Sequence, residues 1–163
     1  SWEGMCAADG RPSLKLAHCY ADLARGGAGM IITGYTFVSP EGKQLPGKMG
    51  IHRDDFADDH RRLTQAVHDA GGILAIQLVH AGGQANADQI GRRPVAPSAV
   101  KADQFLEVPD ELSIPEIHAI ATAFGQAAAR AKAWGYHTLA CASTGNTSAS
   151  MASYAAVSGM EGV

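Results

Sequence analysis

Polar side chains interrupt apolar parts of this chain in two places where they could do chemistry. Gln77 is the one strongly polar residue within the apolar run 73–79, and His80 follows it at the start of a glycine-rich loop. A carboxamide donates and accepts hydrogen bonds at once, so Gln77 could bind the edge of a planar ring such as a flavin or a nucleobase. The alternative is a core amide satisfied within the sheet. His80 could act as acid, base or donor, or could hold its own loop in place.

The second place is a dense polar cluster that follows an apolar run near the end of the chain. Its members are Ser143, Thr144, Gly145, Asn146 and Thr147. Hydroxyls and free backbone N–H groups between a strand and a helix can bind an anion such as phosphate or carboxylate. The alternative is ordinary N-capping of the helix that follows. The cluster has neither the Walker A nor the G-x-G-x-x-G pattern, and the chain lacks a G-x-S-x-G elbow.

No metal site is expected from the spacing of the remaining candidate ligands. His60 and His68 lie eight residues apart, so they do not share one turn of a helix. Asp54, Asp55 and their neighbours read as a solvated, negatively charged helix start that complements the helix dipole. The three cysteines lack C-x-x-C spacing, which argues against a disulfide framework or zinc ribbon and favours a reducing, cytoplasmic compartment.

The elements that must position these groups alternate along the chain. Apolar runs predict strands covered on both faces, and apolar stripes between capping residues predict helices. We expect strands at 30–38, 73–79 and 138–142, and helices capped by Ser13, covering about 55–70, opened by a capping box at Ser113, and covering about 147–157. The buried stripes should contain Leu16, Ala17, Tyr20, Leu23 and Ala24 in the first helix, and Ile117, Ile120, Ala121, Phe124, Ala128 and Ala131 in the third. Residues 87–112 should be irregular.

Composition narrows the classes of function. Hydrophobic residues make up 46% of the 163 residues, as in a globular domain. The net charge of −3 offers no basic surplus, so we do not expect nucleic-acid binding. No run reaches the roughly 18 apolar residues that a bilayer requires, so we expect no membrane partner.

Several stretches resemble the first half of the old yellow enzymes, in the NADH:flavin oxidoreductase family, in family order and at family spacing. These stretches are Trp2-Glu3-Gly4-Met5, Ala28 to Tyr35, Ser39-Pro40-Glu41-Gly42, Gln77 to Gly82, Ala96-Pro97-Ser98-Ala99, and the helix from Phe124 to Gly135. The resemblance implies a (β/α)8 barrel that binds FMN and reduces activated alkenes with NAD(P)H. It places Ser1 near the reactive edge of the flavin, Tyr35 at a backbone contact, and Gln77 at the pyrimidine ring.

The resemblance to that family ends near residue 137. The His pair and Tyr that anchor a substrate carbonyl in the family fall, without a gap, on Ala142, Gly145 and Thr147. From about 138 to 160 the chain instead resembles threonine synthase, a fold-type II pyridoxal-phosphate enzyme, whose Asn corresponds to Asn146. The Schiff-base lysine motif and the phosphate loop of that enzyme are missing, so we do not expect bound pyridoxal phosphate. These two resemblances predict a catalytically incomplete chimera joined near 128–138, in which FMN is not retained. The alternative is residual FMN binding through Ser1, Tyr35 and Gln77, with weak NAD(P)H:flavin or alkene-reductase activity.

The order of elements predicts a parallel sheet with right-handed helical crossovers. We expect residues 1–163 to form one α/β domain, in which 1–137 is flavoenzyme-like and 138–163 is a threonine-synthase-like βα unit. The length falls short of the roughly 250 residues of a full barrel, so the prediction is a partial (half) barrel with a flavodoxin-like number of elements. Open strand edges need a partner, so we expect a homodimer or higher oligomer.

Overall fold

The computed structural model describes residues 3–140, 153 and 155–162. The helices are α1 (Leu14–Arg25), α2 (Ala57–Asp69), α3 (Ala87–Ile90) and α4 (Ile114–Ala133), with short 3₁₀ turns η1 (Pro40–Gly42), η2 (Asp54–Phe56) and η3 (Gly82–Gln84). The strands are β1 (Met30–Phe37), β2 (Met49–Gly50), β3 (Ile73–Val79), β4 (Val95–Ala96), β5 (Asp110–Glu111), β6 (Thr138–Ala140) and β7 (Glu161–Gly162). No helix of the described ranges is both long and apolar enough to cross a membrane.

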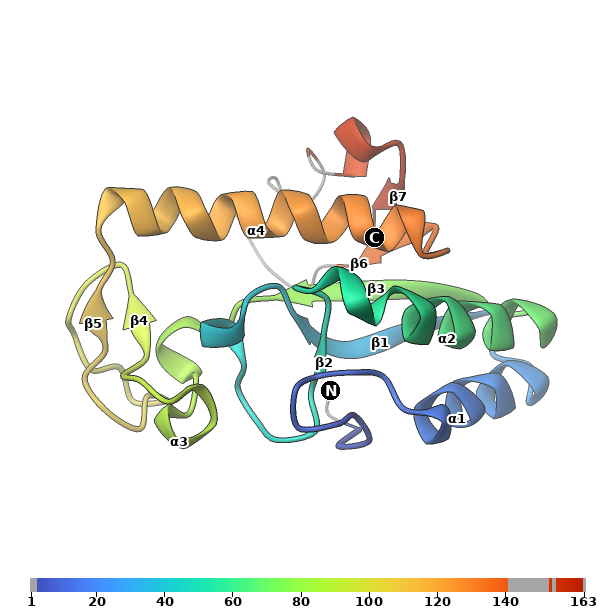
Figure 1. Ribbon diagram of the computed structural model, residues 1–163, viewed down its shortest axis with the longest axis horizontal. Coiled ribbons are helices and arrows are strands. Elements are labelled where there is room, and N and C mark those ends of the chain that lie inside the picture. Colours follow the sequence, from blue (N-terminus) through green and yellow to red (C-terminus); the bar gives the residue numbers. More distant parts are fainter. Residues whose placement is uncertain (1–2, 141–152, 154, 163) are drawn as a thin grey trace.

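A parallel sheet with strand order β2-β1-β3-β6-β7 forms the centre of the fold (Figure 1). This confirms the predicted parallel α/β class. β7 pairs with β6 beyond the three predicted strands. The segment 87–112, expected to be irregular, contains α3 and the short parallel pair β4-β5. Figure 1 shows this segment beyond the carboxyl ends of β1 and β3, where ligands of such sheets bind.

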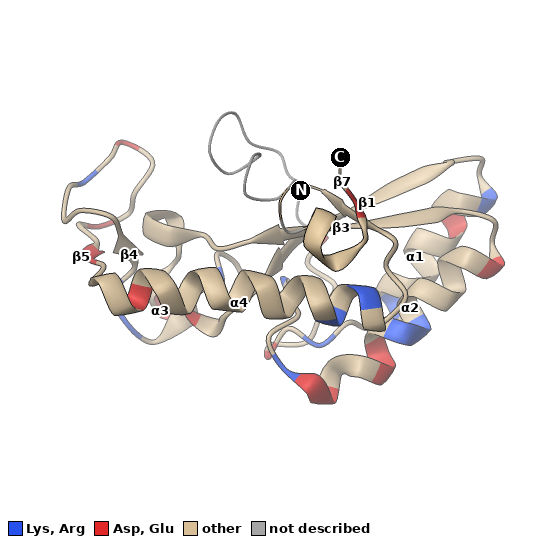
Figure 2. Ribbon diagram, turned by 90° about the horizontal axis from the view of Figure 1, so that it is seen from above, with Lys and Arg blue, Asp and Glu red and all other residues tan. Residues whose placement is uncertain are grey.

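The three long helices α1, α2 and α4 lie on one face of the sheet (Figure 2). The core lies between that face and the helices; Ile31, Leu74, Ile76 and Leu139 contribute to it from the strands. The other face is less covered: Met30, Ile32 and Ile73 are 42%, 50% and 46% exposed. The prediction that the strands are covered on both faces is therefore wrong at their amino ends.

The helices begin where the sequence predicts. The Ser13 side chain accepts a hydrogen bond from the Leu16 N–H, and Ser113 and Glu116 form the predicted capping box. The buried stripes differ from expectation. Leu23 is 50% exposed, and α4 buries Ala127, Ala128 and Ala131 in its second half, whereas Ile117 is 42% exposed. The first half of α4 extends past the sheet towards β5, where no described helix covers it (Figure 1).

A buried histidine links α2 to the segment before β6. His60 is fully buried; its Nδ1 lies 2.8 Å from the Tyr136 hydroxyl and its Nε2 lies 2.9 Å from the Gly50 carbonyl. The carbonyl can only accept, so Nε2 carries the proton and Nδ1 accepts from Tyr136. His60 is thus a structural cross-link, and among the described residues no cluster suits a metal ion.

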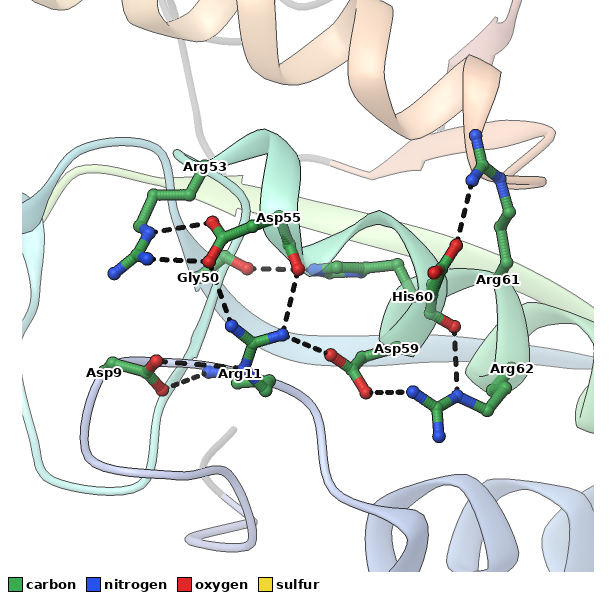
Figure 3. A network of polar contacts seen from close by, with 10 residues as sticks. Asp9, Arg11, Gly50, Arg53, Asp55, Asp59, His60, Arg61 and Arg62 are labelled. Atoms are coloured by element: carbon green, nitrogen blue, oxygen red, sulfur yellow. Dashed lines mark hydrogen bonds and ion pairs between the residues drawn. The ribbon is translucent and has the colours of Figure 1, made fainter.

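Arg11 binds the acidic start of α2 (Figure 3). Its guanidinium donates to the Asp59 carboxylate at 2.7 Å and to the Asp55 carboxylate at 3.0 Å. Arg130 of α4 binds Asp54 at 2.6 Å. The prediction of a solvated helix start is confirmed for Asp54 and Asp58, whose side chains are 84% and 86% exposed, whereas that of Asp59 is 15% exposed. The ion pairs of Asp54, Asp55 and Asp59 in addition tie this start to the N-terminal segment and to α4.

Replacing Arg11 with alanine is expected to lower the urea midpoint of unfolding, because it leaves Asp55 and Asp59 side by side without this shared cation. The difference from wild type should shrink at 1 M salt, since screening weakens exposed ion pairs. Arg25→Ala, which removes an exposed pair within α1, is the matched control and should change the midpoint less. Equal effects of the two substitutions would contradict a special role for Arg11.

Candidate functional site

Tyr35, Gln77 and Ala140 form one row across the carboxyl half of the sheet. Tyr35 is in register with Gln77, and Gln77 with Ala140. Ile76 and Leu139, their neighbours in the chain, belong to the core against the helices. Side chains alternate between faces along a strand, so the row faces away from the helices. The structure thus brings together two of the residues that the sequence singled out, Tyr35 and Gln77.

A β-bulge in β1 sets the direction of Tyr35. The pairing shifts between Ile32 and Tyr35, so Thr33 and Gly34 lie opposite a single residue of β3. The buried Thr33 hydroxyl accepts the Gln77 N–H at 3.0 Å and donates to the Gly34 carbonyl at 2.9 Å. The bulge therefore also fixes the backbone of Gln77.

Glu3 stabilises the bulge from the N-terminal segment. Its carboxylate accepts the Gly34 N–H at 2.7 Å and the Tyr20 hydroxyl at 2.5 Å. Burial and the bond to Glu3 raise the pKa of Tyr20, so this hydroxyl stays protonated and remains a donor. A side chain at position 34 would overlap the Glu3 carboxylate, which explains why glycine occupies the bulge.

The side chain of Lys48 brings a buried positive charge to this edge of the sheet. Lys48 is 3% exposed, and its Nζ lies 4.3 Å from the centre of the Tyr35 ring. Burial lowers the pKa of Lys48, and the charge of Glu3 opposes that shift. A small hollow beside it is lined by Tyr35, Phe37, Gly42, Gln44, Lys48 and Val79. The hollow therefore combines the polar side chains of Gln44 and Lys48 with the apolar side chains of Phe37 and Val79.

The Gln77 carboxamide makes no hydrogen bond to the described part of the chain. Gln77 is 8% exposed, and its hydrogen bond to that part of the chain is made by the backbone. Thr138, on the same face two register positions away, has a buried hydroxyl that lacks a partner in those ranges. A buried polar group without a hydrogen-bond partner is energetically unfavourable, and a bound ligand can supply that partner. The arrangement suits a flat, polar ring lying against the sheet.

Several predicted site residues lie outside the described residues. These are Ser1, Ser143, Thr144, Gly145, Asn146 and Thr147, so their roles stay predictions. The sequence reasoning missed Glu3 and Lys48 as site residues, although Glu3 lies within a quoted family stretch. No spacing rule links either residue to Tyr35, because their proximity arises from the folding of separate segments.

Comparison with known proteins agrees with this geometry. A profile of the NADH:flavin oxidoreductase / NADH oxidase family matches residues 4–142. The NADPH dehydrogenase of Bacillus velezensis is 36% identical over 121 residues, which cover 74% of this chain and 35% of that protein. The NADH oxidase of Thermoanaerobacter brockii is 37% identical over 126 residues, which cover 76% of this chain and 19% of that protein.

Solved structures show the same relationship. The old yellow enzyme homologue from Zymomonas mobilis superimposes with a TM-score of 0.78 and 32% identity, covering 86% of this chain and 41% of that chain. Morphinone reductase in complex with tetrahydroNAD gives a TM-score of 0.75 and 30% identity, covering 83% of this chain and 41% of that one.

The parallel sheet with its helices on one face corresponds to part of the (β/α)8 barrel of the old yellow enzymes. The chain belongs to the NADH:flavin oxidoreductase / NADH oxidase family. It spans between 19% and 41% of the length of these relatives. The family match extends to residue 142, past the predicted end of the resemblance near 137. The threonine synthase resemblance of 138–160 stays a prediction.

Proposed function

We propose that this chain is part of an NAD(P)H-dependent oxidoreductase and forms part of its FMN site. The residues around Gln77 would bind the pyrimidine edge of the flavin. The observation that carries the proposal is the buried Gln77 carboxamide, which lies at the carboxyl ends of the strands on the sheet face away from the helices and has no hydrogen-bond partner for its side chain among the described residues. Such an amide can donate to a ring carbonyl and accept from a ring N–H at the same time.

Each described residue has a distinct task in this proposal. Gln77 orients the flavin through its two hydrogen bonds, and the Tyr35 backbone lies beside the same ring. Thr33 and Glu3 hold the bulge and so fix both. Lys48 contributes a buried positive charge beside Tyr35, which favours an electron-rich flavin or an anionic ligand. The bound flavin supplies the hydride chemistry of the family.

Gln77→Leu tests the proposal, because leucine keeps the side chain's bulk and removes both hydrogen bonds. We expect wild type to quench the fluorescence of added FMN, and the variant to bind at least about tenfold more weakly. Gln65→Leu, at an exposed position of α2, is the matched control and should bind as wild type does. Equal affinities for all three proteins, or no binding by wild type, would reject the proposal.

We propose that the chain does not reduce alkenes by itself. The proposal rests on Ala142, Gly145 and Thr147, which replace the family's carbonyl-binding imidazoles and Tyr in an ungapped alignment. With FMN and NADPH supplied, alkene reduction should not exceed the rate of free flavin. Turnover well above that rate would overturn this proposal, whether or not flavin binding is confirmed.

We also propose that the chain associates with a second copy of itself. Met30, Ile32 and Ile73 form an apolar group on the uncovered sheet face, with exposures of 42%, 50% and 46%. Burying such a group against its copy removes apolar surface from water. Light scattering at micromolar concentration should give at least twice the chain's mass, and Ile32→Lys should lower it. A wild-type monomer would contradict the proposal.

Two further proposals concern the origin of residues 138–163 and the cellular compartment of the protein. We propose that residues 138–163 derive from a threonine-synthase-like βα unit and bind no pyridoxal phosphate. Adding pyridoxal phosphate should then produce no absorption band of a lysine aldimine.

We propose a cytoplasmic location, because Cys6 and Cys19 are free thiols, as is usual in a reducing compartment. Fractionating cells that express the chain tests this proposal.

A further inference from the structure

Two loops frame the proposed flavin site, one after β1 and one after β3. Backbone hydrogen bonds join them: the Val38 N–H donates to the Val79 carbonyl at 3.2 Å, and the Ala81 N–H donates to the Gly42 carbonyl at 3.0 Å. Between these two bonds the first loop makes the turn η1, whereas the second loop contributes the single residue His80.

The imidazole of His80 fills the space inside that turn. Its side chain is 7% exposed and packs directly against Gly42, where a Cβ atom would lie 2.7 Å from the imidazole Cδ2. The Nδ1 atom accepts the Gly82 N–H at 3.1 Å, so the ring proton of neutral His80 resides on Nε2. Nε2 is buried and has no hydrogen-bond partner within the described ranges.

Glu41 faces this unsatisfied nitrogen from η1. Its Oε1 lies 3.8 Å from His80 Nε2. The interaction with His80 is the main cause that lowers the pKa of Glu41 to about 2, so the carboxylate is charged at any pH where the protein works. Arg92 and Glu116 line the pocket on the other side of Glu41 and bring opposite charges to it.

We propose that Glu41 and His80 act as positioning residues for the flavin site, by tying the loop after β1 to the loop after β3. The proposal rests on the proposed function of Gln77. Gln77 lies in β3, three residues before His80 in the loop that follows, and the Thr33 hydroxyl holds the Gln77 backbone from the other side. The Glu41–His80 contact supplies the second fixed point, so the Gln77 carboxamide is held between the bulge and the tied loops.

Glu41→Gln tests the proposal, because it removes the charge and keeps the shape of a half-exposed side chain. Glu111→Gln is the matched control: it makes the same chemical change at an exposed position of β5. We expect Glu41→Gln to weaken FMN binding about fivefold and Glu111→Gln to leave it within about twofold of wild type. Equal losses for both variants would overturn the proposal.

NMR spectra separate this inference from the flavin proposal, because they need no flavin. In Glu41→Gln the His80 ring resonances and the Gln77 side-chain amide resonances should move. In Glu111→Gln both should stay as in wild type. If wild type binds no FMN but these NMR changes occur, the flavin proposal fails and the tie between the loops stands. Unchanged His80 and Gln77 signals in Glu41→Gln would overturn the tie itself.

Discussion

Replacing Gly34 with alanine is expected to lower the free energy of unfolding by about 1–3 kcal/mol and to weaken flavin binding. The new methyl group would overlap the Glu3 carboxylate and displace it. Tyr20 would then keep a buried hydroxyl proton without its acceptor, and the Gly34 N–H would lose its 2.7 Å bond. Thr33 of the same bulge accepts the hydrogen bond from the Gln77 N–H, so the affinity for flavin should fall together with the free energy of unfolding.

Gly29→Ala is the matched control for this prediction. Gly29 directly precedes β1, and a Cβ there would meet nothing within 4 Å. Urea unfolding should therefore separate the two alanine variants clearly. Glu3→Ala removes the displaced carboxylate in advance, so adding Gly34→Ala to it should have little further effect. Similar losses for Gly29→Ala and Gly34→Ala, or full additivity with Glu3→Ala, would contradict the assigned contact.

Acidification from pH 7 to pH 5 is expected to reduce stability by about 2 kcal/mol through His60. Burial lowers the pKa of His60 from 6.5 to about 4. The unfolded chain therefore binds a proton more readily than the folded protein between these two values. The stabilisation is complete above pH 6.5, and it is lost progressively as the pH falls towards 4.

His60→Gln isolates this contribution, because glutamine does not titrate. Urea midpoints at pH 7 and pH 5 should differ less in the variant than in wild type. Burial also lowers the pKa values of His52 and His68, but both proteins share those groups. Tyr136→Phe should destabilise at both pH values by about 1–3 kcal/mol, because it leaves the buried His60 Nδ1 without its donor. An unchanged pH dependence in His60→Gln would reject the assignment.

The site was only partly predictable from the sequence. Gln77 stands out because a carboxamide in an apolar strand is unusual, and the resemblance adds Tyr35 to it. The bulge at Thr33 and Gly34 leaves no clear mark in the sequence, because it depends on how β1 pairs with β3. Glu3, Lys48 and the Glu41–His80 contact were missed as partners for the same reason: each joins segments whose separation along the chain carries no periodic signal.

Local structure and family membership follow from the sequence alone. Apolar periodicity, the Ser13 and Ser113 caps and the family stretches depend on neighbouring residues, so α1, α2, α4, the three main strands and the parallel sheet were predicted. Which face of each element is buried, and which groups meet, depends on the tertiary structure. His60 reaches Tyr136 across 76 residues, and Gln77 joins Tyr35 in one row, because burial removes water as their alternative partner and leaves only the groups that the fold brings close.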